Sequence, residues 1–170
     1  LNEDNRYWGL RQNDASNAFR GRNYLIYFMG SSGLPANDWV ISGCYGLDGG
    51  RKYKIAMHYK LGSGEHNLLL AAGNQPLPEA MNLSLWEGNG LRAPEPNAFT
   101  RIEHVFEAPS SGEFYFGIKQ QSIPAQGSSI IDYLVVIAKP DIIPLGSPVG
   151  FGQTVTLQAL ASDSLVWFSD

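Results

Sequence analysis

The stretch Ala36-Asn37-Asp38-Trp39-Val40-Ile41-Ser42 decides how the rest of the chain is interpreted. Asn37 and Asp38 have side chains that can hydrogen-bond to their own backbone, which favours a turn. The three residues from Trp39 onward are aromatic or β-branched, as is typical of a strand in a buried β layer. The stretch therefore predicts a turn that leads into a buried strand, with Trp39 in the core.

The composition excludes several classes of protein. Of the 170 residues, 44% are hydrophobic and only 16% are charged, while glycine and proline number 19 and 10. A core can therefore be buried, and the many turn-forming residues favour an all-β protein of short strands. The net charge is −4 without any run of lysine or arginine, which argues against nucleic acid as a partner. No apolar run approaches the ~18 residues that a spanning helix needs, so direct membrane insertion is not expected.

Alternation of apolar and polar residues predicts a series of antiparallel strands. It is clearest at residues 53–60, where every second residue from Tyr53 is apolar and the opposite face, including His58, is expected to face solvent. Further strands are predicted at residues 24–29, 67–72, 83–86, 99–106, 113–119 and 129–137. These strands predict an all-β sandwich, and their pattern alone leaves jelly-roll and Ig-like topologies open.

A cluster of prolines and glycines that begins at Pro140 predicts a domain boundary. We expect residues 1–139 to form the sandwich and residues 140–170 to form a linker and the truncated start of a second β domain. Strands are predicted there at residues 154–159 and 165–168. The alternative is an extension that docks on the first domain, since small domains need more than about 40 residues to bury enough surface. The irregular start of the sequence suggests a piece of a longer protein.

Several pieces of the chain resemble the cleaved-adhesin domains of gingipains and haemagglutinins, and the related jelly-roll modules of Gram-negative surface proteins. The resemblance is carried by residues 37–42, 50–55, 111–118 and 131–134. It implies an antiparallel two-sheet jelly-roll β-sandwich with a short C-terminal β extension. Residues 142–170 are similar to the first strands of an Ig-like domain.

The resemblance also implies a function and a location. It implies a noncatalytic adhesion or ligand-binding module of a bacterial multidomain protein, secreted or displayed on the outer surface of a Gram-negative cell. The expected partner is a host or environmental protein or a glycan. The alternative is a carbohydrate-binding accessory module of a secreted polysaccharide-degrading enzyme.

Asp132 interrupts the apolar segment at 129–137, and an ionised carboxylate is costly to bury unless it is paired or binds a metal. Similar jelly-roll modules often hold a structural calcium ion between their terminal strands. We therefore hypothesise a calcium site formed by Asp132 with oxygens from Asp38, Glu3 or Asp4, because calcium prefers about six to eight oxygen ligands. The alternative is that Asp132 accepts hydrogen bonds from the backbone or an arginine.

Binding of a sugar needs exposed aromatic faces beside hydrogen-bonding side chains. Trp86 and Tyr115 are candidates, because their apolar strand neighbours are expected to point to the opposite face. Glu87 and Asn89 follow Trp86 in a segment expected to be a loop, and loops 87–98 and 120–128 are the predicted contact surface. Packing in the core or an interface is the alternative for each aromatic residue.

Catalysis is the least favoured interpretation. A glycosidase needs two carboxylates about 5 to 9.5 Å apart. Glu103 and Glu113 are expected on neighbouring outward faces and could meet this distance. Such pairs on a sheet are most often solvated. Cys44 is expected to be a small buried residue, because no histidine forms a recognisable motif with it.

Overall fold

The computed structural model describes residues 7–28, 35–95, 97–123 and 127–139, together with the backbone of residues 141–145 and 156–160. Within these residues the one helical element is a 3-10 turn, η1, at Pro78–Ala80. Ten strands precede residue 139: β1 (Tyr7–Arg11), β2 (Tyr24–Phe28), β3 (Ala36–Ile41), β4 (Tyr45–Leu47), β5 (Lys52–Leu61), β6 (His66–Gly73), β7 (Leu83–Leu91), β8 (Thr100–Glu107), β9 (Gly112–Ser122) and β10 (Ser129–Ala138).

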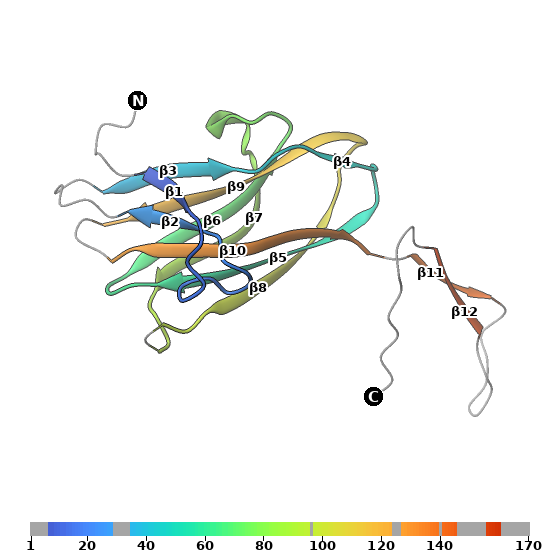
Figure 1. Cartoon of the computed structure of the whole chain (residues 1–170). Helices are drawn as coiled ribbons and strands as arrows, with labels where there is room; N and C mark the ends of the chain where they lie inside the picture. Colours follow the sequence, from blue (N-terminus) through green and yellow to red (C-terminus); the bar gives the residue numbers. More distant parts are fainter. Residues whose placement is uncertain are drawn as a thin grey trace.

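The ten strands form two facing antiparallel sheets (Figure 1). Sheet A has the strand order β1-β2-β10-β5-β8. Sheet B has the order β3-β9-β6-β7, and β4 pairs with β9 beyond the end of β3. The predicted all-β antiparallel sandwich is therefore confirmed.

The core lies between the sheets and is made by the inward side chains of alternating strands. On β5, Ile55 and Met57 have no exposed surface, and on β9 Phe116 and Ile118 are only 1% and 2% exposed. Each such side chain contributes about 1.5–3 kcal/mol when fully buried, so both strands stabilise the sandwich substantially. The alternation that predicted the inward faces of both strands is confirmed.

Three local features were not predicted. The strands β1 and β4 are short, and neither has an alternation long enough to be recognised. Strand β7 continues to Leu91, through residues that were expected to form a loop. Its register shifts between the pairs Leu70–Trp86 and Ala71–Ser84, so Leu85 is an extra residue in a β-bulge. The bulge places Leu85 and Trp86 on the same inward side, which simple alternation cannot predict.

The segment between β1 and β2, residues 12–23, crosses the outer face of sheet A, and we call it the strap. The Phe19 ring stacks on the His58 ring with centroids 3.6 Å apart and an interplanar angle of 13°. Asn17 accepts a hydrogen bond of 2.9 Å from Lys60 Nζ. His58 and Lys60 are consequently only 7% and 6% exposed. The expectation that His58 faces solvent is wrong, because the strap covers an outward face that the alternation correctly identified.

Beyond the sandwich, β11 (Asp141–Leu145) and β12 (Thr156–Leu160) pair with each other as an antiparallel two-stranded sheet. Strand β12 overlaps the strand expected at residues 154–159, whereas the strand expected at 165–168 lies outside the described residues. The division into residues 1–139 and 140–170 and the Ig-like identity of the second part remain predictions. Among the residues that the structure describes, no helix is long and apolar enough to cross a membrane.

Candidate functional site

The outer face of sheet B carries one row of side chains that crosses all four strands. Trp39 on β3 pairs with Lys119 on β9, which pairs with Leu69 on β6, which pairs with Glu87 on β7. Directly opposite residues of antiparallel strands point to the same face of a sheet. An aromatic ring, a cation, an apolar side chain and a carboxylate are thus aligned on one surface, and we call it the Trp39 face.

Trp39 lies across the sheet on a glycine. A Cβ atom on Gly117 would lie 2.9 Å from Trp39 Cε3 and 2.9 Å from Met81 Sδ, so only a glycine allows this close approach. The Lys119 Nζ lies 5.5 Å from the Trp39 ring centroid, within the range of a cation–π interaction. The prediction that Trp39 is in the core is wrong, because Asp38 and Val40 take the inward positions of β3. The ring is half-buried and fixed from below, with Lys119 at its side.

A row of side-chain amides runs parallel to the Trp39 row. Asn37 on β3 pairs with Gln121 on β9, which pairs with Asn67 on β6. The Asn67 Oδ1 accepts a hydrogen bond of 2.8 Å from the Gly90 backbone, which orients its amide nitrogen away from β7. Amides both donate and accept hydrogen bonds, so this row can bind hydroxyl groups next to the aromatic ring.

The structure places some of the site residues expected from the sequence on the outer face of sheet B and one of them in the core. Glu87 lies in the Trp39 row, and Asn89 is exposed on the same strand. Tyr115 is half-exposed on β9 and points outward, as predicted. Trp86 points inward and its ring centroid lies 6.0 Å from that of Tyr59 in the core, so the predicted outward orientation of Trp86 is wrong. A role of these residues in ligand binding remains a prediction.

Tyr115 and Cys44 lie at one end of this surface. Cys44 is exposed, so the expectation that it is a small buried residue is wrong. The hydrogen bond between Cys44 and Tyr115 raises the pKa of the Tyr115 phenol, and burial and the Glu113 carboxylate act in the same direction. Tyr115 therefore remains a neutral hydrogen-bonding group at physiological pH.

The two predicted calcium ligands that the structure describes do not meet. Asp132 accepts hydrogen bonds from the backbone N–H groups of Phe19 (2.7 Å) and Arg20 (3.1 Å), and its other oxygen accepts one from Tyr133 (2.6 Å). Asp38 lies inside β3, where its carboxylate accepts a hydrogen bond from the Tyr27 hydroxyl, so it does not form the predicted turn. The alternative of backbone hydrogen bonds therefore describes Asp132.

The calcium site itself remains a prediction. Glu3 and Asp4 lie outside the described residues, and the part of the chain that is described contains no group of three or more His, Cys, Asp or Glu side chains that could hold a metal ion. Asp132 fits the hypothesis poorly, because amide donors already occupy its oxygens. Melting temperatures measured with and without a chelator test the hypothesis.

The carboxylates considered for glycoside hydrolysis are on different sheets. Glu103 is on β8 of sheet A and Glu113 is on β9 of sheet B. Glu103 forms ion pairs with Lys54 (3.1 Å) and with Arg101. The hydrogen bond from Lys54 lowers the pKa of Glu103, whereas a general acid needs a raised pKa. The expectation that the two carboxylates lie on neighbouring surfaces is wrong, and they do not form a catalytic pair.

Solved structures with the same fold include adhesin and carbohydrate-binding domains. The K1 cleaved adhesin domain of Lys-gingipain from Porphyromonas gingivalis W83 has a TM-score of 0.64 and 10% identity, covering 81% of this chain and 86% of that chain. TmCBM61 in complex with β-1,4-galactotriose has a TM-score of 0.56 and 12% identity, covering 78% of this chain and 88% of that chain.

A further similar structure contains the CBM22-1 and GH10 modules of xylanase 10B from Clostridium thermocellum in complex with xylohexaose. Its TM-score is 0.52 at 19% identity, covering 79% of this chain and 25% of that chain. No protein-family model and no curated protein matches the chain. At such identities the likeness shows the fold alone, and at that level the predicted resemblance to cleaved adhesin domains is confirmed.

Proposed function

We propose that this chain is a noncatalytic module that binds a glycan on the Trp39 face. The arrangement that supports the proposal is the row Trp39–Lys119–Leu69–Glu87 beside the amides of Asn37, Gln121 and Asn67. A rigid aromatic ring offers an apolar surface for the face of a sugar ring, and the amides and Glu87 offer hydrogen bonds to its hydroxyl groups.

The Trp39 row and the amide row form an elongated surface, which Met81 borders near Gly117. Such a surface suits a chain of several sugars better than a single small molecule. Small-molecule sites are concave and bury most of their ligand, whereas the Trp39 row and the amide row extend across all or most of sheet B. The two carbohydrate-binding neighbours that carry oligosaccharides support this class of ligand. We further propose that the module acts outside the cell, in a secreted or surface-displayed bacterial protein.

The experiment is a glycan array followed by calorimetric titration of the best ligands, with xylohexaose and β-1,4-galactotriose included as probes. We expect Trp39→Ala to weaken binding by about tenfold or more, because it removes the stacking surface. The matched control is Val105→Ala, which truncates an exposed side chain (47%) on sheet A and is expected to leave binding unchanged. Equal affinity of the folded Trp39→Ala variant and the wild type would overturn the proposal.

Adhesion to a protein is the second candidate, and the likeness to the K1 adhesin domain supports it. The glycan array and the titrations distinguish protein adhesion from glycan binding. A protein ligand would be captured by a chain that binds no glycan on the array, and Trp39→Ala would then reduce capture of that protein.

A further inference from the structure

The two sheets differ in how completely neighbouring strands pair along β9 in sheet B and along β10 in sheet A. In sheet B, β3 and β4 follow one another along β9 and together pair with it from Ser122 to Gly112. In sheet A, β2 pairs with β10 only from Ser129 to Ile131. Beyond a register shift, residues 135–138 of β10 pair with β5, and no described strand pairs with their other edge. Among the described strands, sheet A thus has none in the position that β4 takes in sheet B.

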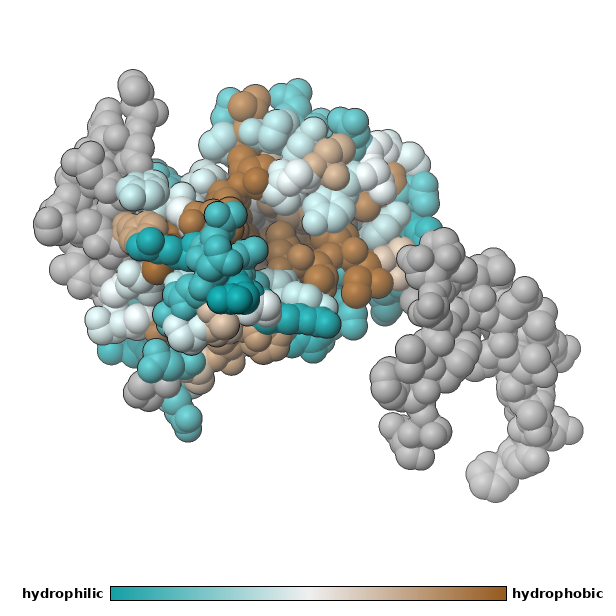
Figure 2. All heavy atoms as spheres, viewed as in Figure 1, coloured by the Kyte–Doolittle hydropathy of each residue, from teal (hydrophilic) through white to brown (hydrophobic). Residues whose placement is uncertain are grey.

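The side chains along this open edge belong to the core but are not fully covered. Ile131, which lies beside β2, is only 1% exposed. Leu134, Val136 and Ala138 pack against the core but remain partly exposed. Figure 2 shows a brown, hollowed area over the C-terminal half of β10, which is bordered by polar surface. We call the open edge at residues 134–138 the β10 slot.

Backbone groups also point into the β10 slot. Lys139 donates a backbone hydrogen bond of 2.8 Å to the Lys52 carbonyl, so these two residues form a hydrogen-bonded pair. Hydrogen-bonded and non-hydrogen-bonded pairs alternate along an antiparallel ladder. The N–H and C=O groups of Val136 and Ala138 therefore point away from β5, toward the slot.

An irregularity at residues 132–135 and Lys139 bound the β10 slot, but residues 134–138 themselves carry no protecting charge or proline. Exposed edges are usually protected by lysine, proline, inward charges or a bulge. From Leu134 to Ala138 the sequence is Leu-Val-Val-Ile-Ala, without a charge or a proline. An unprotected apolar edge of this kind is suited to β-strand addition, in which the main chain gives affinity and alternate side chains give specificity.

The geometry points to an extended peptide strand of another polypeptide as the occupant of the β10 slot. The open edge is only about five residues long and is bounded by β2 at Tyr24, so it accommodates one strand more readily than the whole sheet edge of a second copy. A strand antiparallel to β10, as β2 is, would begin beside Ala138. Its apolar side chains at alternate positions would cover Leu134 and Val136.

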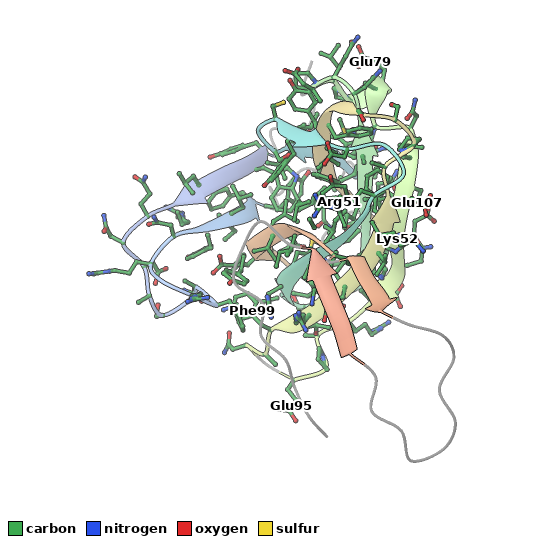
Figure 3. All side chains as sticks on the ribbon, turned by 90° about the vertical axis from the view of Figure 1, so that its right-hand side faces the viewer. Arg51, Lys52, Glu79, Glu95, Phe99 and Glu107 are labelled. Carbon is green, nitrogen blue, oxygen red and sulfur yellow. The ribbon has the colours of Figure 1, made fainter. Side chains whose placement is uncertain are left out.

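The charges at the Ala138 end specify the start of that strand. Arg51 lies two residues before Tyr53, the partner of Ala138, and its guanidinium lies 6.0 Å from the Tyr53 ring centroid. Its Nε is buried and has no hydrogen-bond partner. Figure 3 shows Arg51 toward the middle of this end of the sandwich, whereas Lys52 and Glu107 lie nearer its margin. Asp48 pairs with the Arg51 Nη1 at 3.5 Å, and Glu107 pairs with Lys52 at 4.0 Å, so both charges are partly balanced. The Arg51 Nε and the Lys139 that follows Ala138 remain as donors for an acidic residue at the start of the bound strand.

The test uses a blocked synthetic peptide, acetyl-Asp-Val-Thr-Val-Thr-Val-amide, and amide exchange of the full chain followed by NMR. We expect the amides of Val136 and Ala138 to exchange fast in the free protein and at least tenfold more slowly with saturating peptide. The amides of Val135 and Ile137, which bond to β5, serve as internal controls and should change little. The same peptide with a central proline, or with lysine in place of aspartate, should bind at least tenfold more weakly.

Two protein variants separate this binding from general loss of structure. Val136→Pro removes an N–H that points into the slot but is not used by β5, so it should abolish peptide binding. Arg51→Gln should weaken the aspartate peptide about tenfold and leave the lysine peptide unaffected, and it keeps the test valid if Val136→Pro does not fold. Slow exchange of Val136 and Ala138 in the free monomer would overturn the proposal, because the chain itself would then fill the slot. Protection that grows with protein concentration would overturn it in favour of a second copy, and failure of the peptide to change the exchange of either amide would overturn it outright.

Discussion

The outer faces of the two sheets follow from the same alternation in the sequence, but connecting segments cover them to different extents. On both, alternation separates an apolar inward face from an outward face that carries polar side chains. On sheet A the strap covers this face, so that Phe19 stacks on a buried His58. On sheet B the connection between β6 and β7 covers only the area around Gly117, where Met81 packs beside the Trp39 ring. The row from Lys119 to Glu87 stays accessible. The comparison teaches that connecting segments, and not strand periodicity, decide how much of an outward face remains accessible.

The largest effect is expected where the strap is attached. Asp132→Ala removes the acceptor of the Phe19 and Arg20 backbone N–H groups, and we expect it to lower the free energy of unfolding by about 2–3 kcal/mol, because hydrogen bonds to charged groups are strong. Chemical denaturation measures this loss. Asp132→Asn, which keeps one oxygen acceptor, should lose less. Equal stability of Asp132→Ala and the wild type would show that the strap is not held by this carboxylate.

A substitution beneath Trp39 tests the Trp39 face in the same way. Gly117→Ala places a Cβ against the Trp39 ring and Met81, and we expect it to cost about 1–3 kcal/mol of stability through overpacking. The displaced ring should also bind glycans more weakly in calorimetric titrations. Gly43→Ala, at a glycine with no atom within 4 Å of a new Cβ, is the matched control. Unchanged stability and affinity of Gly117→Ala would mean that the position of the ring does not depend on Gly117.

Removal of the Phe19 ring from the outer face of sheet A is expected to have a smaller effect on stability and to change the pKa of His58. Phe19 is 45% exposed, so Phe19→Ala is expected to cost about 1–2 kcal/mol in lost burial and ring stacking. Burial lowers the pKa of His58, with the charge of Arg101 acting in the same direction, while Asp132 opposes both. We expect Phe19→Ala to move the pKa of His58 back toward its ordinary value in an NMR titration. A pKa unchanged by the substitution would contradict the role of Phe19 as its cover.

The sign of the pH dependence follows from the direction of the shift. Burial lowers the pKa of both His58 and His66, so below about pH 6.5 the unfolded chain binds protons that the folded chain does not. Stability from these residues is complete above that pH and is lost as the pH falls toward the lowered values. Denaturation curves between pH 7.5 and 5 should show this decrease, and the His58→Gln, His66→Gln double variant should show less of it.

The smallest effect is expected at the cation beside Trp39. Lys119→Met removes the cation–π interaction but keeps the length of the side chain, and we expect a loss of about 0.5–1 kcal/mol in stability or a similar change in glycan affinity. Lys119→Arg should retain the interaction. A loss as large as that caused by Trp39→Ala would show that Lys119 contacts the ligand directly.

Much of the fold could be predicted from the sequence because strand alternation is a local property. The strands β5, β8 and β9 lie where the alternation placed them, and β6 and β10 lie where apolar runs placed them, all to within three residues at their ends. Strand β1 could not be predicted, because Tyr7 and Trp8 are too few to reveal a period. The inward orientation of Trp86 depends on the bulge at Leu85, which arises from pairing with β6 and not from the sequence of β7 itself.

The candidate site was predicted only in part. Tyr115 was placed outward by the alternation of β9, which can be recognised locally. Glu87 and Asn89 were chosen as loop residues after Trp86, and the structure places both on β7 instead. Trp39 was missed as a site residue because its apolar neighbours suggested a buried strand. The alternation of Asp38, Trp39 and Val40 contained the information, since an inward Asp38 requires an outward Trp39. What the sequence did not show was that the buried Tyr27 hydroxyl makes an inward Asp38 acceptable.

The exposed thiol beside Tyr115 has a practical consequence. Cys44 is the one cysteine of the sequence, and it lies at the end of the Trp39 face. A maleimide fluorophore would therefore attach at a single, known position without any substitution. Its emission would report occupancy of the neighbouring surface, so the natural protein can serve as its own optical sensor for screening carbohydrate libraries.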